Sequence, residues 1–152
     1  IRGGNSRMAS VLCGVKACVK QAGFVAIHDA ARPLLRPWHL ENVIQQAMVH
    51  GAACLVVPMK DSVKKLEDGF ITADVPRASL AAAQTPQVFA RSQIQHALQT
   101  AMARGLDTTD DCAAAELVGI PVFAVQGDYT NIKVTTPEDV VVARAFLQEM
   151  EE

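Results

Sequence analysis

A length of 152 residues, half of them hydrophobic, indicates a single globular domain with a buried core. The formal net charge of -2 leaves no basic surface of the kind that binds a nucleic acid backbone, so we expect no nucleic acid partner. No apolar run approaches the roughly 20 residues that cross a bilayer, so we expect no membrane-spanning segment.

Helix and strand patterns alternate in the first part of the chain. Residues 8–20 carry apolar side chains at helical spacing, which predicts an amphipathic helix. Residues 24–28 form a short apolar run that is typical of a strand buried on both faces. Pro37 at a first helical position predicts a helix over 37–49, and residues 53–58 repeat the buried-strand pattern.

The next segment, residues 59–77, alternates polar and apolar side chains around Glu67-Asp68-Gly69, which is typical of a β-hairpin. It is too polar for a pair of core strands, so we expect it to project from the body as an arm. Gln84-Thr85-Pro86-Gln87 then predicts a polar turn between two apolar segments.

The last part of the chain continues the alternation. Ser92-x-x-Gln95 and Thr108-x-x-Asp111 are capping boxes that predict the starts of two helices. Residues 121–125 and 131–135 are predicted strands, and Thr136-Pro137-Glu138-Asp139 predicts the start of a last helix. The order favours an α/β fold with a mostly parallel sheet, helices on both faces and ligands at the carboxyl ends of the strands.

Asp29 and Arg32 directly follow the first predicted strand. A carboxylate can hold Mg²⁺ and a guanidinium can bind phosphate, although the spacing also allows a structural ion pair between the two. Lys133 interrupts an apolar segment, so it either pairs with an anion or extends to solvent from an edge strand. Four cysteines without C-x-x-C spacing and four histidines without i, i+4 spacing predict no zinc site.

Weaker candidates lie in three other segments. Thr109-Asp110-Asp111 at a predicted helix start could bind an anion, but alone it is more often a cap. Gln84-Thr85-Pro86-Gln87 alone is more often a turn. The pair Gly3-Gly4 is common and does not by itself make a phosphate loop.

Together and in this order, the segments resemble 2-C-methyl-D-erythritol 4-phosphate cytidylyltransferases of the non-mevalonate isoprenoid pathway. The match runs through nearly all of the chain. It is carried by Gly3-Gly4 followed by Ser10-Val11-Leu12, His28-Asp29-Ala30-Ala31-Arg32-Pro33, Asp61-Ser62-Val63-Lys64, Pro76-Arg77, Gln84-Thr85-Pro86-Gln87-Val88-Phe89, Thr109-Asp110-Asp111, and Asn131 through Asp139.

The resemblance implies a Rossmann-like nucleotidyltransferase that uses Mg²⁺ to transfer the cytidylyl group of CTP to 2-C-methyl-D-erythritol 4-phosphate, releasing pyrophosphate. It implies catalytic roles for Asp29, which also contacts the metal and the nucleotide, and for Arg32 and Lys133. The implied acceptor contacts are Thr85 and Thr109, and the implied nucleotide contacts are Gly4, Asn5, Ser10 and Ala30.

The resemblance also implies a homodimer in which the arm, residues 59–77, reaches into the neighbouring subunit. Ser62 and Arg77 would then complete the partner's substrate site. The implied location is the cytoplasm of a bacterium, or a plastid in a plant or alga.

The chain departs from the family pattern in three respects. Asn5 stands where the family usually has Asp beside the cytosine, and Ser62 stands where Thr is usual. The family begins with a strand and a glycine-rich loop that cradles the triphosphate, and neither is found here, so we expect residues 1–152 to be one incomplete domain. A ribitol 5-phosphate cytidylyltransferase and a non-catalytic dimerising or ligand-binding remnant remain alternatives.

Overall fold

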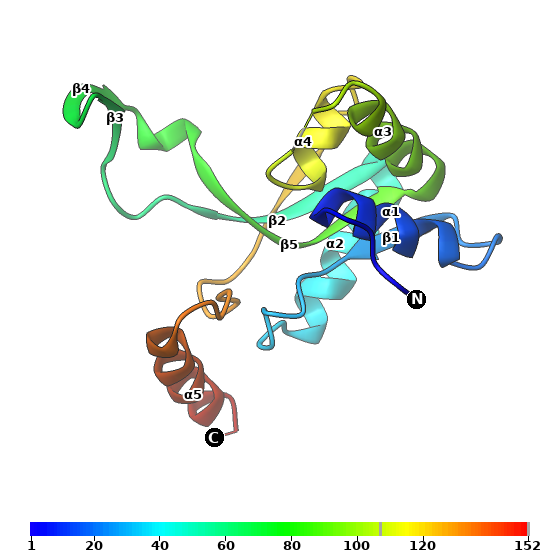
Figure 1. The fold of residues 1–152 in the computed structure, drawn as a ribbon. Helices are drawn as coiled ribbons and strands as arrows, with labels where there is room; N and C mark the ends of the chain where they lie inside the picture. The colour runs from blue at the N-terminus through cyan, green and yellow to red at the C-terminus, as the bar shows by residue number, and fades with distance from the viewer. Residues whose placement is uncertain (107, 152) are drawn as a thin grey trace.

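A computed structural model describes residues 1–106 and 108–151 and shows an α/β fold (Figure 1). The helices are α1 (Arg7–Ala17), α2 (Pro37–His50), α3 (Arg91–Ala103), α4 (Asp111–Glu116) and α5 (Pro137–Glu151), with a short 3₁₀ helix at Arg77–Ser79. The strands are β1 (Phe24–Ile27), β2 (Ala52–Pro58), β3 (Val63–Glu67), β4 (Phe70–Val75), β5 (Ala81–Ala90) and β6 (Phe123–Gln126).

The central sheet has four strands in the order β1-β5-β2-β6. Strands β1, β2 and β6 run in the same direction, and β2 pairs with β6 in parallel. Three of the four strands therefore share one direction, which confirms the expected mostly parallel sheet. Strand β5 runs the opposite way between β1 and β2, so its two ladders are antiparallel.

Two apolar layers cover the two faces of this sheet. Helices α1, α3 and α4 pack against one face, which includes Cys54 and Phe89. Helix α2 packs against the other face, which includes Leu55 and Val88. Neighbouring residues of a strand point to opposite faces, so continuous apolar runs serve both layers, and helices on both faces are confirmed.

Residues 84–87 do not form the predicted turn, because they lie inside β5 and are buried. Their pairing with β2 shifts register between Cys54, which faces Gln87, and Val56, which faces Ala83. An advance of two residues along β2 thus corresponds to an advance of four residues along β5. Pro86 has no N–H to donate, and an irregular ladder accommodates it in a central strand. The polar composition that suggested a turn marks this irregularity instead.

The predicted strand at 131–135 is also wrong. The backbone N–H of Asn131 donates to Asp128 O at 3.1 Å and that of Ile132 donates to Thr130 O at 2.8 Å, which are turn contacts. One backbone bond, from Val134 N to Ala31 O at 2.8 Å, ties this segment to the residues that follow β1. Local turn bonds therefore replace a ladder.

Both predicted capping boxes before α3 and α4 are wrong, although both helices exist. Strand β5 runs directly into α3, so Ser92 lies inside the helix and Ala90 is its N-cap. Helix α4 is capped by Asp110, whose carboxylate accepts from Ala113 N at 2.9 Å. The cap expected before α5 is confirmed, since Thr136 Oγ1 accepts from the backbone N–H of Asp139 at 3.3 Å and Asp139 Oδ2 accepts from that of Thr136 at 2.8 Å.

The predicted hairpin is confirmed as a separate two-stranded sheet of β3 and β4 that extends away from the body (Figure 1). Asp68 and Gly69 form its turn with φ values of 50° and 85°, which Asp-Gly pairs adopt readily. Helix α5 also lies apart from the sheet (Figure 1). Within the described residues, we find no helix whose length and apolarity would suit a membrane span.

Candidate active site

A polar cavity of about 310 Å³ lies where β1 ends beside β5. It contains five of the seven side chains expected to act in catalysis or acceptor binding, the exceptions being Ser62 and Arg77, which were expected to act in the partner's site. Its lining consists of Arg7, Asp29, Arg32, Ala83, Gln84, Thr85, Gln87, Thr109, Asp110 and Lys133. Segments separated by about a hundred positions in the chain thus contribute to one site.

Asp29 faces two cations in this cavity. Its Oδ2 lies 2.9 Å from Lys133 Nζ, and its Oδ1 lies 3.9 Å from Arg7 Nη2. Burial alone would raise the pKa of Asp29, but the hydrogen bond and charge of Lys133, with the charges of Arg7 and Arg32, lower it below its ordinary value. Asp29 is therefore held as a carboxylate, and Lys133 pairs with it, which is the first of the two alternatives that the sequence allowed for Lys133.

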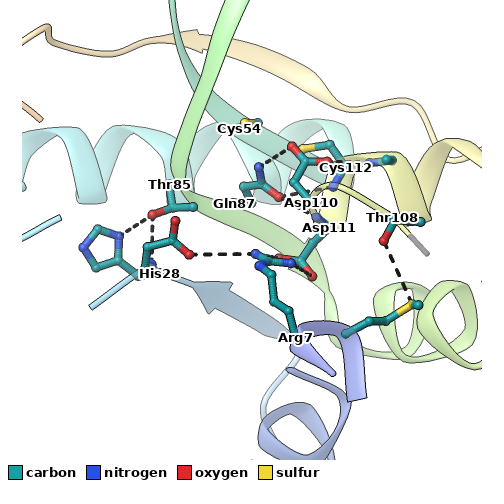
Figure 2. A network of polar contacts seen from close by, with 12 residues as sticks. Arg7, His28, Cys54, Thr85, Gln87, Thr108, Asp110, Asp111 and Cys112 are labelled. Carbon is teal, nitrogen blue, oxygen red and sulfur yellow. Dashed lines mark hydrogen bonds and ion pairs between the residues drawn. The ribbon is translucent and has the colours of Figure 1, made fainter. Parts of the chain in front are cut away.

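Hydrogen bonds to Thr85 and His28 fix the turn that carries Asp29. The Asp29 amide donates to Thr85 Oγ1 at 3.0 Å, and the same oxygen lies 2.9 Å from His28 Nδ1 (Figure 2). The other ring nitrogen of His28 lies 3.1 Å from the carbonyl oxygen of Arg32. The turn between Asp29 and Arg32 is closed by a backbone bond of 2.9 Å.

The sequence also allowed a structural ion pair between Asp29 and Arg32. The described residues do not form it. Arg32 Nη1 instead donates to the carbonyl oxygen of Asn131 at 2.6 Å, which links the turn after β1 to the turn before Lys133. Its Nε is buried and has no hydrogen-bond partner within the described residues. Burial lowers the pKa of Arg32, against the attraction of Asp29. The guanidinium thus retains donors that a ligand could use.

Arg7 belongs to the site although sequence reasoning did not select it. Its Nη1 and Nη2 donate to the two carboxylate oxygens of Asp111 at 3.2 and 2.8 Å (Figure 2). The Asp111 side chain is 1% exposed, and burial raises its pKa while Arg7 offsets part of that effect. A signal existed, because Arg7 is the first residue of α1, where the helix dipole disfavours a cation without an anionic partner.

Gln87 fixes the backbone of the segment that carries Asp111. Its Oε1 accepts from the backbone N–H groups of Asp111 and Cys112 at 3.1 and 3.2 Å, and its Nε2 donates to Asp110 Oδ2 at 2.9 Å (Figure 2). Gln84 lies three residues earlier in β5, and its Oε1 accepts from Asn131 Nδ2 at 3.2 Å. Sequence reasoning missed these roles because it read both glutamines as part of a turn.

Apart from Asp29, the expected nucleotide contacts lie outside the cavity lining. Gly4 N donates to Ser10 Oγ at 3.1 Å, which folds the loop before α1 onto the helix. A Cβ on Gly4 would lie 2.5 Å from Ala9 Cβ, so this close approach requires glycine. Asn5 is exposed in the same loop, and Ala30 lies in the turn after Asp29. They lie on the two segments that also supply Arg7 and Asp29.

Ser62 and Arg77 are not brought to the cavity of the same chain. Ser62 is exposed on the arm. Arg77 donates to the carbonyl oxygen of Lys60 and lines a second cavity of about 520 Å³ at the base of the arm. That cavity is larger, but it lacks the convergent carboxylate and cations that surround Asp29.

The donor set around Asp29 suits a divalent cation only if a ligand supplies most of the oxygens. No group of three or more His, Cys, Asp or Glu side chains in the described part of the chain could hold a metal. Both oxygens of Asp110 already accept hydrogen bonds, which leaves Asp29 as the carboxylate of the cavity that could bind one. Mg²⁺ commonly binds one or two carboxylates together with substrate phosphates and water, so such an ion fits.

Fold and site together define an α/β domain with a polar cavity, lined by three cations, where β1 ends beside β5. Comparison with known proteins identifies the family. The model of the family "IspD: 2-C-methyl-D-erythritol 4-phosphate cytidylyltransferase" matches residues 1–149, and the chain belongs to this family.

Individual relatives agree with the family match. The 2-C-methyl-D-erythritol 4-phosphate cytidylyltransferases of Bacillus licheniformis and Desulforamulus reducens are 43% and 46% identical, each over 97% of this chain. The crystal structure of the Thermus thermophilus enzyme of that name superposes with a TM-score of 0.89 at 33% identity, covering 97% of this chain and 72% of that one. The chain spans 64% of the length of the two curated relatives.

Proposed function

We propose that the protein transfers the cytidylyl group of CTP to 2-C-methyl-D-erythritol 4-phosphate, giving 4-diphosphocytidyl-2-C-methyl-D-erythritol and pyrophosphate. The observation that carries the proposal is the convergence of Asp29, Arg32, Thr85, Thr109 and Lys133 on one cavity in a chain of this family. These side chains offer cations and hydroxyl groups to a phosphate, which is the chemistry that the acceptor requires.

In the proposed reaction, an oxygen of the acceptor phosphate attacks the α-phosphorus of CTP. A phosphorus–oxygen bond forms there as the bond to the bridging oxygen of pyrophosphate breaks, and the pyrophosphate carries away the electron pair. Both reactants are anions, so positioning and charge neutralisation supply most of the catalysis. Arg32 and Lys133 neutralise and orient the acceptor phosphate, and the hydroxyl groups of Thr85 and Thr109 complete its contacts.

The nucleotide would lie beside the loop before α1, near Gly4, Asn5 and Ser10, and against Ala30. Asp29 would hold a Mg²⁺ ion that arrives with the triphosphate. When bound, this ion neutralises charge on the phosphates. Lys133 would then exchange its contact with Asp29 for one with the acceptor phosphate, which its half-exposed side chain permits.

The arm supports a further part of the proposal, a homodimer in which residues 59–77 contact the neighbouring subunit. Its exposed apolar side chains, Leu66, Phe70 and Ile71, are 65%, 76% and 67% exposed in the single chain. Leu66 and Ile71 pair across the two strands, and exposed apolar side chains that lie together in this way are typical of protein interfaces. Ser62 and Arg77 would be supplied to the partner's cavity.

The test is turnover with purified protein, CTP and Mg²⁺. Pyrophosphate release should be measured with 2-C-methyl-D-erythritol 4-phosphate and with ribitol 5-phosphate, for the chain as printed and for the longest natural polypeptide that contains it. We expect turnover with the first acceptor. Turnover with ribitol 5-phosphate alone would reassign the acceptor, and no turnover with either by the longer polypeptide would favour a non-catalytic protein.

A further inference from the structure

The ion pair between Arg7 and Asp111 has features that a purely structural contact does not need. Asp111 is buried, but the Arg7 side chain is 38% exposed and lines the cavity that contains Asp29. A buried ion pair is often no more stabilising than apolar residues of similar size, so stability alone is a weak reason for it. Its geometry directs a guanidinium into the cavity.

The hydrogen bonds of Arg7 leave it free to bind a second anion. A guanidinium has five N–H groups, and Asp111 occupies one on each terminal nitrogen. Among the described residues, the Arg7 side chain makes no other hydrogen bond, and its next anion is Asp29, whose Oδ1 lies 3.9 Å from Arg7 Nη2. The remaining N–H groups therefore have donor capacity on the side of the cavity.

The charges around the cavity also favour an anionic ligand. Its lining includes three cations, Arg7, Arg32 and Lys133, against the two carboxylates Asp29 and Asp110. Asp110 is engaged by the amide of Ala113 and the side chain of Gln87. Lys133 and Arg7 contact different oxygens of Asp29, so they approach this carboxylate from two sides. A phosphate that displaces Lys133 from Asp29 would therefore have a second cation, Arg7, on the other side of the carboxylate.

We propose that Arg7 binds a phosphate oxygen of the ligand in this cavity, and that Asp111 is the positioning residue that holds its guanidinium. The inference rests on the proposed function for its setting, since it adds a contact to the same site. Arg7 follows the loop with the expected nucleotide contacts, and its partner Asp111 lies two residues after Thr109, an expected acceptor contact. The phosphate that Arg7 binds could therefore belong to CTP or to the acceptor. The shared chemistry is a phosphate oxygen.

The test is calorimetric titration with pyrophosphate and, separately, with 2-C-methyl-D-erythritol 4-phosphate, on the chain as printed and on the longest natural polypeptide that contains it. We expect Arg7→Gln to weaken binding of at least one probe about tenfold or more, as loss of a hydrogen bond between two charged groups does. Arg104→Gln, which removes an exposed cation at the end of α3, is the matched control and should change neither by more than about twofold. The probe that loses affinity identifies the source of the phosphate.

Two further variants separate binding from folding, which circular dichroism should monitor. Asp111→Asn keeps the size of the side chain but weakens its two hydrogen bonds with the guanidinium of Arg7. Arg7→Lys keeps the positive charge but removes the planar guanidinium. Each variant should therefore lower the affinity for the same probe by several-fold. Unchanged affinity of a folded Arg7→Gln variant overturns the inference. If Arg7→Gln does not fold, unchanged affinity of Arg7→Lys overturns it instead. Absence of binding by the parent protein also overturns it. If turnover fails while Arg7→Gln still weakens pyrophosphate binding, the proposed reaction fails and the role of Arg7 stands.

Discussion

Asp29 is the residue on which the electrostatics of the cavity depend, because Lys133 and Arg7 contact its two oxygens. Asp29→Asn preserves the shape of this side chain and removes its charge. We expect turnover in the longest natural polypeptide to fall by about a hundredfold or more, the scale seen when one preorganised electrostatic group is lost. Steady-state kinetics with CTP and the acceptor measure this.

Glu41→Gln is a suitable control for that variant, since Glu41 is an exposed carboxylate on α2, outside both the cavity and the arm. Both substitutions replace one carboxylate with an amide of the same shape. A loss of turnover of similar size in both variants, or a loss below about threefold in Asp29→Asn, would contradict a central role for Asp29.

The lowered pKa of Asp29 predicts how stability depends on pH. The unfolded chain has the higher Asp29 pKa, about 3.9, so the ionised group stabilises the fold above that pH, and its contribution is lost as pH falls through the lower folded pKa. Lys133→Met should therefore reduce the free energy of unfolding near pH 7, and its difference from the parent should shrink below about pH 4.

Urea denaturation at several pH values between about 3 and 7 tests this linkage. Lys20→Met is the matched control, because Lys20 has no ion pair among the described residues. A difference between Lys133→Met and the parent that stays constant over this range would show that Asp29 does not gain its stabilisation from Lys133.

Sequence patterns could locate some site residues but not others. Asp29 and Lys133 could be selected because each is a charged residue next to an apolar segment, where burial demands a partner. Arg7 escaped selection because its partner, Asp111, lies 104 positions away, and only the fold brings the two together. The catalytic and binding roles assigned to the site residues all remain predictions.

At the scale of elements, the helices and the arm could be predicted well, whereas the middle of the sheet could not. Helical periodicity and the Asp68-Gly69 turn are local signals, and both survive in the structure. Strand β5 lacks a comparable signal, since Gln84, Thr85 and Gln87 are buried through contacts with distant segments. Tertiary hydrogen bonds there outweigh the local preference of polar residues and proline for turns.

Helix α3 allows a direct test of the layered core. Leu98 is fully buried against the sheet, whereas Met102, one turn further along, is 43% exposed. Leu98→Ala should lower the free energy of unfolding by about 2–5 kcal/mol, and Met102→Ala by less than about 1 kcal/mol. Chemical denaturation of both variants measures the contrast, and equal losses would mean that α3 does not pack as described.

At the scale of the whole molecule, the separation of Arg77 from the Asp29 cavity bears on the proposed dimer. If Arg77 acts across subunits, an Arg77→Ala subunit and a Lys133→Met subunit should complement each other when mixed. Random exchange should restore roughly a quarter of parental turnover, because half of the dimers are mixed and each keeps one intact site. No recovery, with subunit exchange verified by mass spectrometry, would place Arg77 outside the partner's site.

The position of β5 also constrains the order in which the protein can assemble. The ladder between β1 and β5 cannot form until residues 81–90 have been synthesised and have folded back. During translation, this ladder must therefore wait through the synthesis of α2, β2 and the arm. The hydrogen bond from Asp29 to Thr85 forms at the same late step. A ribosome-bound chain that ends within the arm would carry Asp29 without the strand that positions it.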